Sequence, residues 1–543
     1  MKKNVYVFAV ITLISIALLA GCSNSGNSGG NTDAEQSGET NNTAGTTGES
    51  NSAEGKLTDE EVTYTIALPE NPLQPIDPNA PAFQAITEKT GIKLDIMVIP
   101  GADYPTKMNT LLASGQLPDF FKLWGADPME IYETGALLPM RELIAEHAPI
   151  IQEDYDTIED LKRTMIDNDI YTLPMIRRDV NYEKGTLPII RMDLLEEQQL
   201  DVPTTWDELY EVLKQLKEAY PNAIPYGARG DNRVLFDILS PLPSMGAYYN
   251  LYQTDDKEWQ LGRTKESYKR ALTFYNKLYE EQLLDNEFLL VDTQSWLEGL
   301  SSGKYLFFYD NPVFMNQVNG PLQQIDPDAR FEPIPILENW DGEKQNYKQP
   351  DHYFHQFGIS RNVENPELAI QFWNWLYSEE GTLATNYGIE GEQYTIDENG
   401  EPQWTQAVID EYTKKDDPFY ALQSDFGVGN LSLSPSWLSA AADRFRASSP
   451  DSLSPEAIHE MYVDSPAIKD IPVEPPYTPE EGERIKEINQ DINDFSKVEL
   501  NKFLSGSRPL SEFDQFVTSI NSRGGEELVE IVNEAEQRFQ DNQ

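Results

Sequence analysis

The fold class follows from three neighbouring segments, VTYTIAL at residues 62–68, PAFQAITEKT at 81–90 and IKLDIMVI at 92–99. The first and the third are short apolar runs rich in β-branched residues, which is typical of strands. The middle segment starts with proline and is followed by Gly91, as helices commonly are. The three segments therefore predict a β-α-β unit, and with it an α/β fold.

The alternation of strands and helices continues along the chain. Apolar residues at helical or strand spacing predict helices at 104–114 and 206–220 and strands at 120–124 and 303–310. Two capping boxes are predicted to begin helices, one at Thr205 with Glu208 and one at Thr478 with Glu481. The C-terminal part is therefore expected to be helical.

The composition excludes several functional classes. The chain has 543 residues, with 41 Lys and Arg against 92 Asp and Glu, a net charge of −51, one Cys and four His. A single thiol cannot form an internal disulfide or a Cys-based metal site. Because the acidic excess leaves no basic surface for a phosphate backbone, nucleic acid is not an expected partner. The same charge favours a neutral or cationic ligand over a phosphorylated one.

The N-terminus has the pattern of a secretion signal. Lys2 and Lys3 precede an apolar run, Val5 to Ala20, that is too short to span a membrane. The run ends in Leu19-Ala20-Gly21-Cys22, which resembles a bacterial lipobox. The resemblance implies that residues 1–21 are removed and that Cys22 is lipid-linked; the alternative is a free cysteine at the end of an ordinary anchor. We expect the protein on the extracellular face of the cell membrane.

Residues 22–56 combine this cysteine with a linker. Beyond Cys22 the linker is almost wholly small and polar, so it cannot bury enough apolar surface to fold. It is predicted to be a flexible tether that keeps the folded part close to the membrane.

Segments spread over the chain resemble one family. ASGQLPD at 113–119, IRMDLL at 190–195 with VPTTWDEL at 202–209, and WNWLYSEEG at 373–381 with NYGIEG at 386–391 carry the likeness. They are similar to segments of the family 1 type of extracellular solute-binding proteins, in the lipoprotein branch of Bacillus-like Gram-positive bacteria. The resemblance implies a carrier for a carbohydrate ABC transporter, with no cofactor and no catalytic residue.

The resemblance also implies a two-lobe periplasmic-binding-protein-like fold of type II, with hinge crossovers and a C-terminal helical region. We expect residues 57–180 with 311–360 to form one lobe, and 181–310 with 361–543 to form the other lobe and the C-terminal helices. The crossings are predicted near 171–191, 304–311 and 357–366. Such a protein is expected to be a monomer that binds an oligosaccharide between its lobes and docks on the permease subunits.

Sugar recognition needs aromatic rings, which stack on the C–H face of a pyranose, and planar polar groups, which pair with hydroxyls. We take as candidates those aromatic and polar residues that lie at predicted strand ends or in loops, because ligands of α/β sheets bind there. The alternative is that the aromatic residues are core residues and that the Asp119 carboxylate caps a turn. The candidate ligand-binding residues are Asp119, Trp124, Arg229, Asn232, Trp296, Tyr309, Asp310, Asn311 and Tyr387.

Other functions are weighed against this one. Scattered carboxylates leave open a surface carbohydrate-active hydrolase or lyase, although the chain contains none of the common catalytic motifs. A carrier of peptides or other polar solutes is the other alternative. His352 and His355 are not expected to hold a metal, because residues three apart in a strand face opposite ways. Calcium is left unassigned.

Overall fold

The computed structural model describes residues 56–542 with eleven gaps. The gaps are 72–73, 126–127, 179–185, 230–232, 237–240, 349–355, 416–417, 430–431, 439–440, 442–444 and 446–467. The predicted signal peptide, the linker and Cys22 lie outside the described residues, as do Asn232 and the two histidines at 352 and 355.

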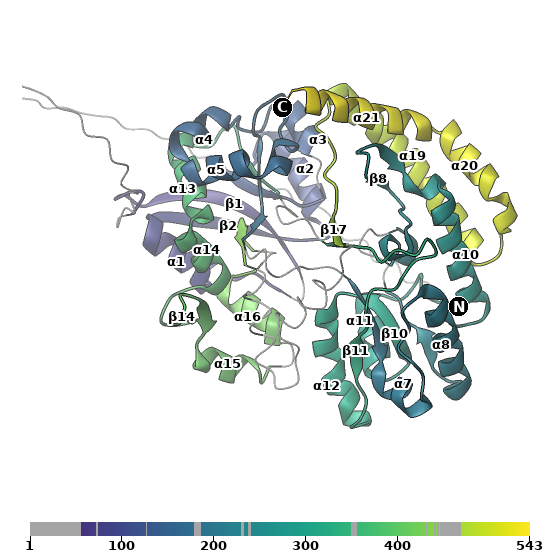
Figure 1. Ribbon diagram of the computed structural model, residues 1–543. Helices are drawn as coiled ribbons and strands as arrows, with labels where there is room; N and C mark the ends of the chain where they lie inside the picture. The colour runs from purple at the N-terminus through teal and green to yellow at the C-terminus, as the bar shows by residue number, and fades with distance from the viewer. Residues whose placement is uncertain are drawn as a thin grey trace, which may run out of the picture. The chain divides into compact units, whose positions relative to one another are not determined.

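The predicted β-α-β unit is present and starts a five-stranded sheet (Figure 1). The order is β2-β1-β3-β13-β4, in which β1, β2 and β3 run parallel and β13 is antiparallel to both of its neighbours. Gly91 ends α1 in the left-handed conformation, as its position predicts. The strands are β1 (Val62–Glu70), β2 (Ile92–Pro100), β3 (Phe120–Leu123), β4 (Thr172–Pro174) and β13 (Gln356–Ile359).

A second sheet has four strands in the order β11-β6-β10-β7. Strand β6 is antiparallel to β10 and β11, whereas β10 and β7 are parallel, so the carboxyl ends of β7 and β10 share one edge. We call the first sheet with its helices lobe 1 and the second sheet with its helices lobe 2. The strands of lobe 2 are β6 (Leu187–Arg191), β7 (Ile224–Tyr226), β10 (Tyr305–Asp310) and β11 (Phe331–Pro333).

Four two-stranded sheets complete the strand structure of the described residues. They pair β5 (Ile176–Arg177) with β16 (Ser436–Trp437), β8 (Leu251–Gln253) with β9 (Trp259–Leu261), β12 (Asn346–Lys348) with β17 (Ile468–Asp470), and β14 (Tyr394–Ile396) with β15 (Pro402–Trp404).

Helices pack against both sheets. In lobe 1 they are α1 (Pro81–Thr90), α2 (Tyr104–Ser114), α3 (Pro128–Glu133), α4 (Arg141–His147), α5 (Pro149–Thr157), α6 (Glu159–Lys162), α13 (Pro366–Tyr377), α14 (Glu379–Tyr387), α15 (Gln406–Tyr412) and α16 (Pro418–Phe426). In lobe 2 they are α7 (Met192–Gln198), α8 (Trp206–Ala219), α9 (Arg233–Phe236), α10 (Glu266–Glu280), α11 (Thr293–Ser301) and α12 (Met315–Ile325). The C-terminal helices are α19 (Pro479–Leu504), α20 (Phe513–Ser522) and α21 (Gly525–Asp541). None of the helices in the described ranges is long and apolar enough to cross a bilayer.

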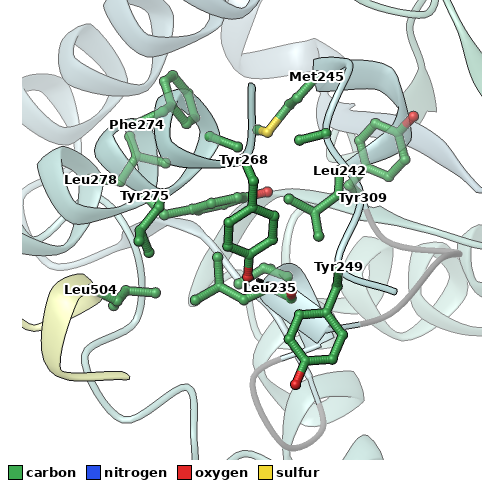
Figure 2. Close-up of a cluster of buried hydrophobic side chains, with 14 of the residues drawn as sticks. Leu235, Leu242, Met245, Tyr249, Tyr268, Phe274, Tyr275, Leu278, Tyr309 and Leu504 are labelled. Carbon is green, nitrogen blue, oxygen red and sulfur yellow. Dashed lines mark hydrogen bonds between the residues drawn. The ribbon is translucent and has the colours of Figure 1, made fainter. Parts of the chain in front are cut away.

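The C-terminal helices belong to the core of lobe 2. Thr478 and Glu481 form the predicted capping box of α19, and Ile485, Ile488 and Ile492, which are spaced three and four residues apart, are buried. Helix α19 lies beside α10 (Figure 1). Figure 2 shows Leu504 of α19 in the same apolar cluster as Tyr275 and Leu278 of α10. The C-terminal helices thus extend the core of lobe 2.

The chain passes between the two sheets at places that differ in part from the predicted ones. The chain leaves β5 and enters the sheet of lobe 2 at β6, within the predicted 171–191. It does not return at 304–311, because β10 and β11 both pair with β6. The return lies between β11 and β13, and α13 then packs on the core of lobe 1. The structure therefore differs from the predicted lobe ranges at α12 and β11, which belong to lobe 2, and at α13, α14, α15 and α16, which belong to lobe 1.

Candidate functional site

A polar cluster stands where β7 and β10 end in lobe 2. Arg229 follows β7 by three residues, and its guanidinium donates to both carboxylate oxygens of Asp310, at 2.8 and 3.1 Å. It also donates to the Thr293 hydroxyl at 3.1 Å, and the backbone N–H of Asn311 donates to Asp310 at 2.7 Å. We call Arg229, Thr293, Asp310 and Asn311 the Arg229 cluster. Three of the predicted ligand-binding residues, Arg229, Asp310 and Asn311, are brought together in it.

Aromatic rings support the guanidinium of the cluster. The Arg229 guanidinium carbon lies 5.3 Å from the ring centre of Trp296 and 4.8 Å from that of Phe314. Cation–π contacts of this kind hold an arginine side chain in place. The fork of Arg229 is thus fixed by Asp310 on one side and by the rings on the other, and the cluster offers hydrogen-bonding groups of the kind that recognise hydroxyls.

Trp296 has a different role from the one predicted. Its side chain is 1% exposed, its indole N–H donates to the Gly227 carbonyl at 3.2 Å, and its ring packs edge-on against Phe308 and Phe314. A ring in this position cannot stack on a sugar without leaving the core. The prediction of Trp296 as a ligand contact is therefore corrected: it is a core residue that underlies Arg229.

Tyr309 is also a core residue. It lies among the buried side chains of lobe 2 beside Leu242 (Figure 2), and its ring stacks on that of Trp206 with a centroid distance of 6.0 Å. Burial raises the pKa of its hydroxyl well above the usual value. Of the predicted pair Tyr309 and Asp310, only Asp310 reaches the Arg229 cluster.

In lobe 1 the predicted pair Asp119 and Trp124 is separated by the whole of β3. Asp119 precedes the strand and Trp124 follows it, which places them roughly 16 Å apart along the chain. The Asp119 carboxylate accepts hydrogen bonds from the backbone N–H and the hydroxyl of Thr65, at 2.8 and 2.7 Å. Asp119 is thus a structural residue at the amino end of β3, whereas the partly exposed Trp124 lies at the carboxyl end, where ligands bind.

Replacing Asp119 with alanine is expected to lower the free energy of unfolding by about 1–3 kcal/mol, because the Thr65 groups lose their acceptor. Ligand affinity should not change. Urea unfolding and ligand titration of the variant test both statements. Asp95→Ala is the matched control: Asp95 is exposed on β2 opposite Thr65 and should change stability by less than about 0.5 kcal/mol.

Sequence reasoning missed Lys122, a lysine buried in β3 two residues before Trp124. Its side chain is 1% exposed, donates to the Ser432 carbonyl at 3.3 Å and lies 5.3 Å from the ring centre of Phe357. Burial lowers its pKa to about 7. The signal was present in the sequence as a single basic residue in the apolar run Phe120–Trp124. Lys122 links the carboxyl end of β3 to the segment before β16.

The last described candidate, Tyr387, lies outside any site. It is buried on α14, with its ring 4.6 Å from that of Trp404 and 5.3 Å from that of Tyr394. Its prediction as a ligand contact is corrected to core packing in lobe 1. Within the described part of the chain, no group of three or more His, Cys, Asp or Glu side chains is arranged to hold a metal ion.

A scan against family models matches residues 72–383 to the bacterial extracellular solute-binding proteins. The chain belongs to this family. Its members bind solutes for transport and are not enzymes. Lipoprotein LipO of Bacillus subtilis (strain 168) is 24% identical over 366 residues, which cover 64% of this chain and 70% of LipO.

Solved structures share the two-lobe fold. The alginate-binding protein AlgQ2, in a crystal structure without calcium ion, superposes with a TM-score of 0.72 and 21% identity, over 88% of this chain and 99% of AlgQ2. The substrate-binding protein FusA of the S. pneumoniae ABC transporter, in complex with kestose, superposes with a TM-score of 0.69 and 18% identity, over 89% of this chain and 100% of FusA. At sequence identities this low, the superpositions establish that the fold is shared and nothing more.

Proposed function

We propose that the protein is a membrane-anchored extracellular substrate-binding protein that captures an oligosaccharide between its lobes and delivers it to an ABC permease. The observation that carries the proposal is the Arg229 cluster. Its polar groups stand at the carboxyl ends of β7 and β10, the edge of an α/β sheet at which ligands bind. Related proteins support the class of ligand, since FusA is described with kestose and AlgQ2 as alginate-binding.

The membrane anchor is a further part of this proposal. Leu19-Ala20-Gly21-Cys22 provides the lipidation pattern, and the relative LipO is named a lipoprotein. Anchoring would hold the binding protein within reach of its permease subunits. Ligand contacts from both lobes would favour the closed form, by no more than the difference in the ligand's affinity for the closed and the open state.

The test is a thermal-shift screen of the purified protein against mono- and oligosaccharides, followed by chromatography of the recovered ligand. A ligand at 100 times its dissociation constant should stabilise the fold by about 2.7 kcal/mol and raise the melting temperature by a few degrees. Recovery of intact sugar is expected. Cleaved sugar would indicate a hydrolase or lyase, and stabilisation only by peptides would indicate a different solute class; either result would overturn the proposal.

Asn311→Ala is expected to weaken sugar binding about tenfold, because it removes the planar side-chain amide of the residue whose backbone N–H, which the variant keeps, donates to Asp310. Isothermal titration with the sugar found in the screen measures the change. The matched control is Asn399→Ala, in the exposed turn between β14 and β15, which should bind as the unchanged protein does. Equal affinities of the two variants would place the sugar elsewhere.

A further inference from the structure

A cavity that shares no lining residue with the Arg229 cluster lies between lobe 1 and the segment that leads into α19. Its volume is about 490 Å³, within the range of pockets that hold small molecules. One wall belongs to lobe 1 and includes Met129 and Met165; the other includes Glu474, Pro475 and Tyr477 of the segment before α19. We call it the Glu474 cavity.

Glu474 is the acceptor group of this cavity. It is exposed where it lines the cavity, and the Tyr477 hydroxyl donates to its carboxylate at 2.7 Å. Although the residue keeps exposed surface, the protein atoms packed around its carboxyl group desolvate that group and raise the pKa of Glu474 above its usual value. Among the described residues no lysine or arginine forms an ion pair with Glu474. Its negative charge is therefore incompletely compensated.

The two cations that line the same cavity are engaged elsewhere. Arg163 forms a bidentate pair with Glu536, at 2.7 and 3.0 Å, and Lys486 pairs with Glu130. A ligand that brings its own positive charge would compensate Glu474 without breaking either pair. The amide of Asn489, which also lines the cavity, makes no hydrogen bond among the described side chains and offers a second polar contact.

The remaining lining residues are mostly apolar, so they favour a cation that carries an aliphatic chain. Methionine adapts its shape to irregular ligands, and proline and isoleucine add rigid apolar surface. A metal ion without an apolar part would leave this apolar surface in contact with water. The apolar lining residues are Pro128, Met129, Met165, Ile166, Val473, Pro475, Pro476 and Ile485.

We propose that the Glu474 cavity binds an organic cation, a primary ammonium group on a short aliphatic chain, with the ammonium at the Glu474 carboxylate and the chain against the methionines and prolines. Because the walls belong to lobe 1 and to the segment joined to lobe 2, the bound cation bridges the two. None of the lining residues belongs to the Arg229 cluster, so binding of the cation does not require a bound sugar.

Isothermal titration of the purified protein with n-butylammonium tests the proposal, with n-butanol as the uncharged probe of the same shape. Butylammonium should bind and butanol should not. Glu474→Gln keeps the size of the side chain and removes its charge, and should weaken butylammonium binding about ten- to a hundredfold. The matched control is Glu483→Gln on α19, which is exposed, does not line the cavity and should leave binding unchanged.

A second variant fills the cavity without touching its charge. Gly482 lines it, and a Cβ there would lie 3.6 Å from Met129, an ordinary contact, so Gly482→Leu should fold and exclude the probe. Absence of butylammonium binding, equal binding of butanol, or full binding by Glu474→Gln would each overturn the proposal.

The pH dependence follows from the ionisation of Glu474. The other titratable groups lining the cavity are Arg163, Lys486 and Tyr477; burial and the Glu474 charge raise the pKa of the tyrosine. Only the ionised carboxylate attracts the ammonium, so affinity should be full above the raised pKa and fall as the pH drops through it. In Glu474→Gln the affinity should no longer follow this titration.

Discussion

Replacing Glu536 with alanine is expected to lower the free energy of unfolding by about 3–5 kcal/mol, the cost of leaving a buried charge without its partner. Glu536 lies on α21 and is 3% exposed. Its carboxylate holds the Arg163 guanidinium of lobe 1 and accepts the indole N–H of Trp259 in lobe 2 at 3.0 Å. The Arg163 guanidinium also lies 4.5 Å from the ring centre of Phe539. This carboxylate therefore joins the two lobes.

Urea unfolding of Glu536→Ala, Arg163→Ala and the double variant measures the coupling. The double variant should lose less than the sum of the single losses, because each single change removes the closest charged partner of the other group; Arg163 then keeps only the longer contact with Asp160, at 3.6 Å. Glu534→Ala, an exposed neighbour on α21, is the matched control and should change stability by less than about 0.5 kcal/mol. Equal losses in Glu536→Ala and Glu534→Ala would contradict the assignment.

Lowering the pH should also remove the contribution of the Glu536 carboxylate to the free energy of unfolding. Burial alone would raise the pKa of Glu536, but the hydrogen bonds from Arg163 and Trp259 outweigh it and lower the pKa below its usual value. A carboxyl with a lowered folded pKa stabilises the fold above its unfolded pKa, and this stabilisation is lost as the pH falls through the folded pKa. The stability difference between the protein and Glu536→Ala should therefore shrink in acid.

Local sequence patterns predicted the elements well, because capping and periodicity act within a few residues. Helix α2 has the predicted bounds, and Thr478 and Glu481 form the predicted box. At Thr205 only half of the box forms: its hydroxyl accepts from the Glu208 N–H, but the Glu208 carboxylate turns to the backbone and hydroxyl of Thr204. The neighbouring Thr204 offers the Glu208 carboxylate a backbone N–H and a hydroxyl, and residue spacing alone does not tell which of the two threonines the carboxylate will bind.

Lobe boundaries and site residues depend on contacts between distant segments, and there prediction was weaker. Strand β11 joins lobe 2 because it pairs with β6, well over a hundred residues earlier. The sequence placed Asp310 at a strand end, but its pairing with Arg229, 81 residues earlier in the chain, became visible only in the structure. Its neighbour Tyr309 turned out to be core, because which face of β10 meets solvent depends on what packs over the sheet.

Trp296→Ala is expected to lower the free energy of unfolding by about 3–5 kcal/mol, as removal of a large core side chain does. The substitution deletes the edge-on contacts with Phe308 and Phe314, whose ring centres lie 5.3 and 5.1 Å away, and leaves the Gly227 carbonyl without its donor. It also removes one of the two rings beneath Arg229. Urea unfolding measures the first effect, and sugar titration under native conditions measures the second.

The comparison with Trp124→Ala separates packing from recognition. Trp124 is partly exposed at the carboxyl end of β3, so its removal should cost less stability and more affinity for the sugar. Trp296→Phe should recover most of the stability, because a ring still fills the space, but it should lack the hydrogen bond to Gly227. If Trp296→Ala kept full stability and lost only affinity, the ring would belong to the sugar site and the present assignment to the core would be wrong.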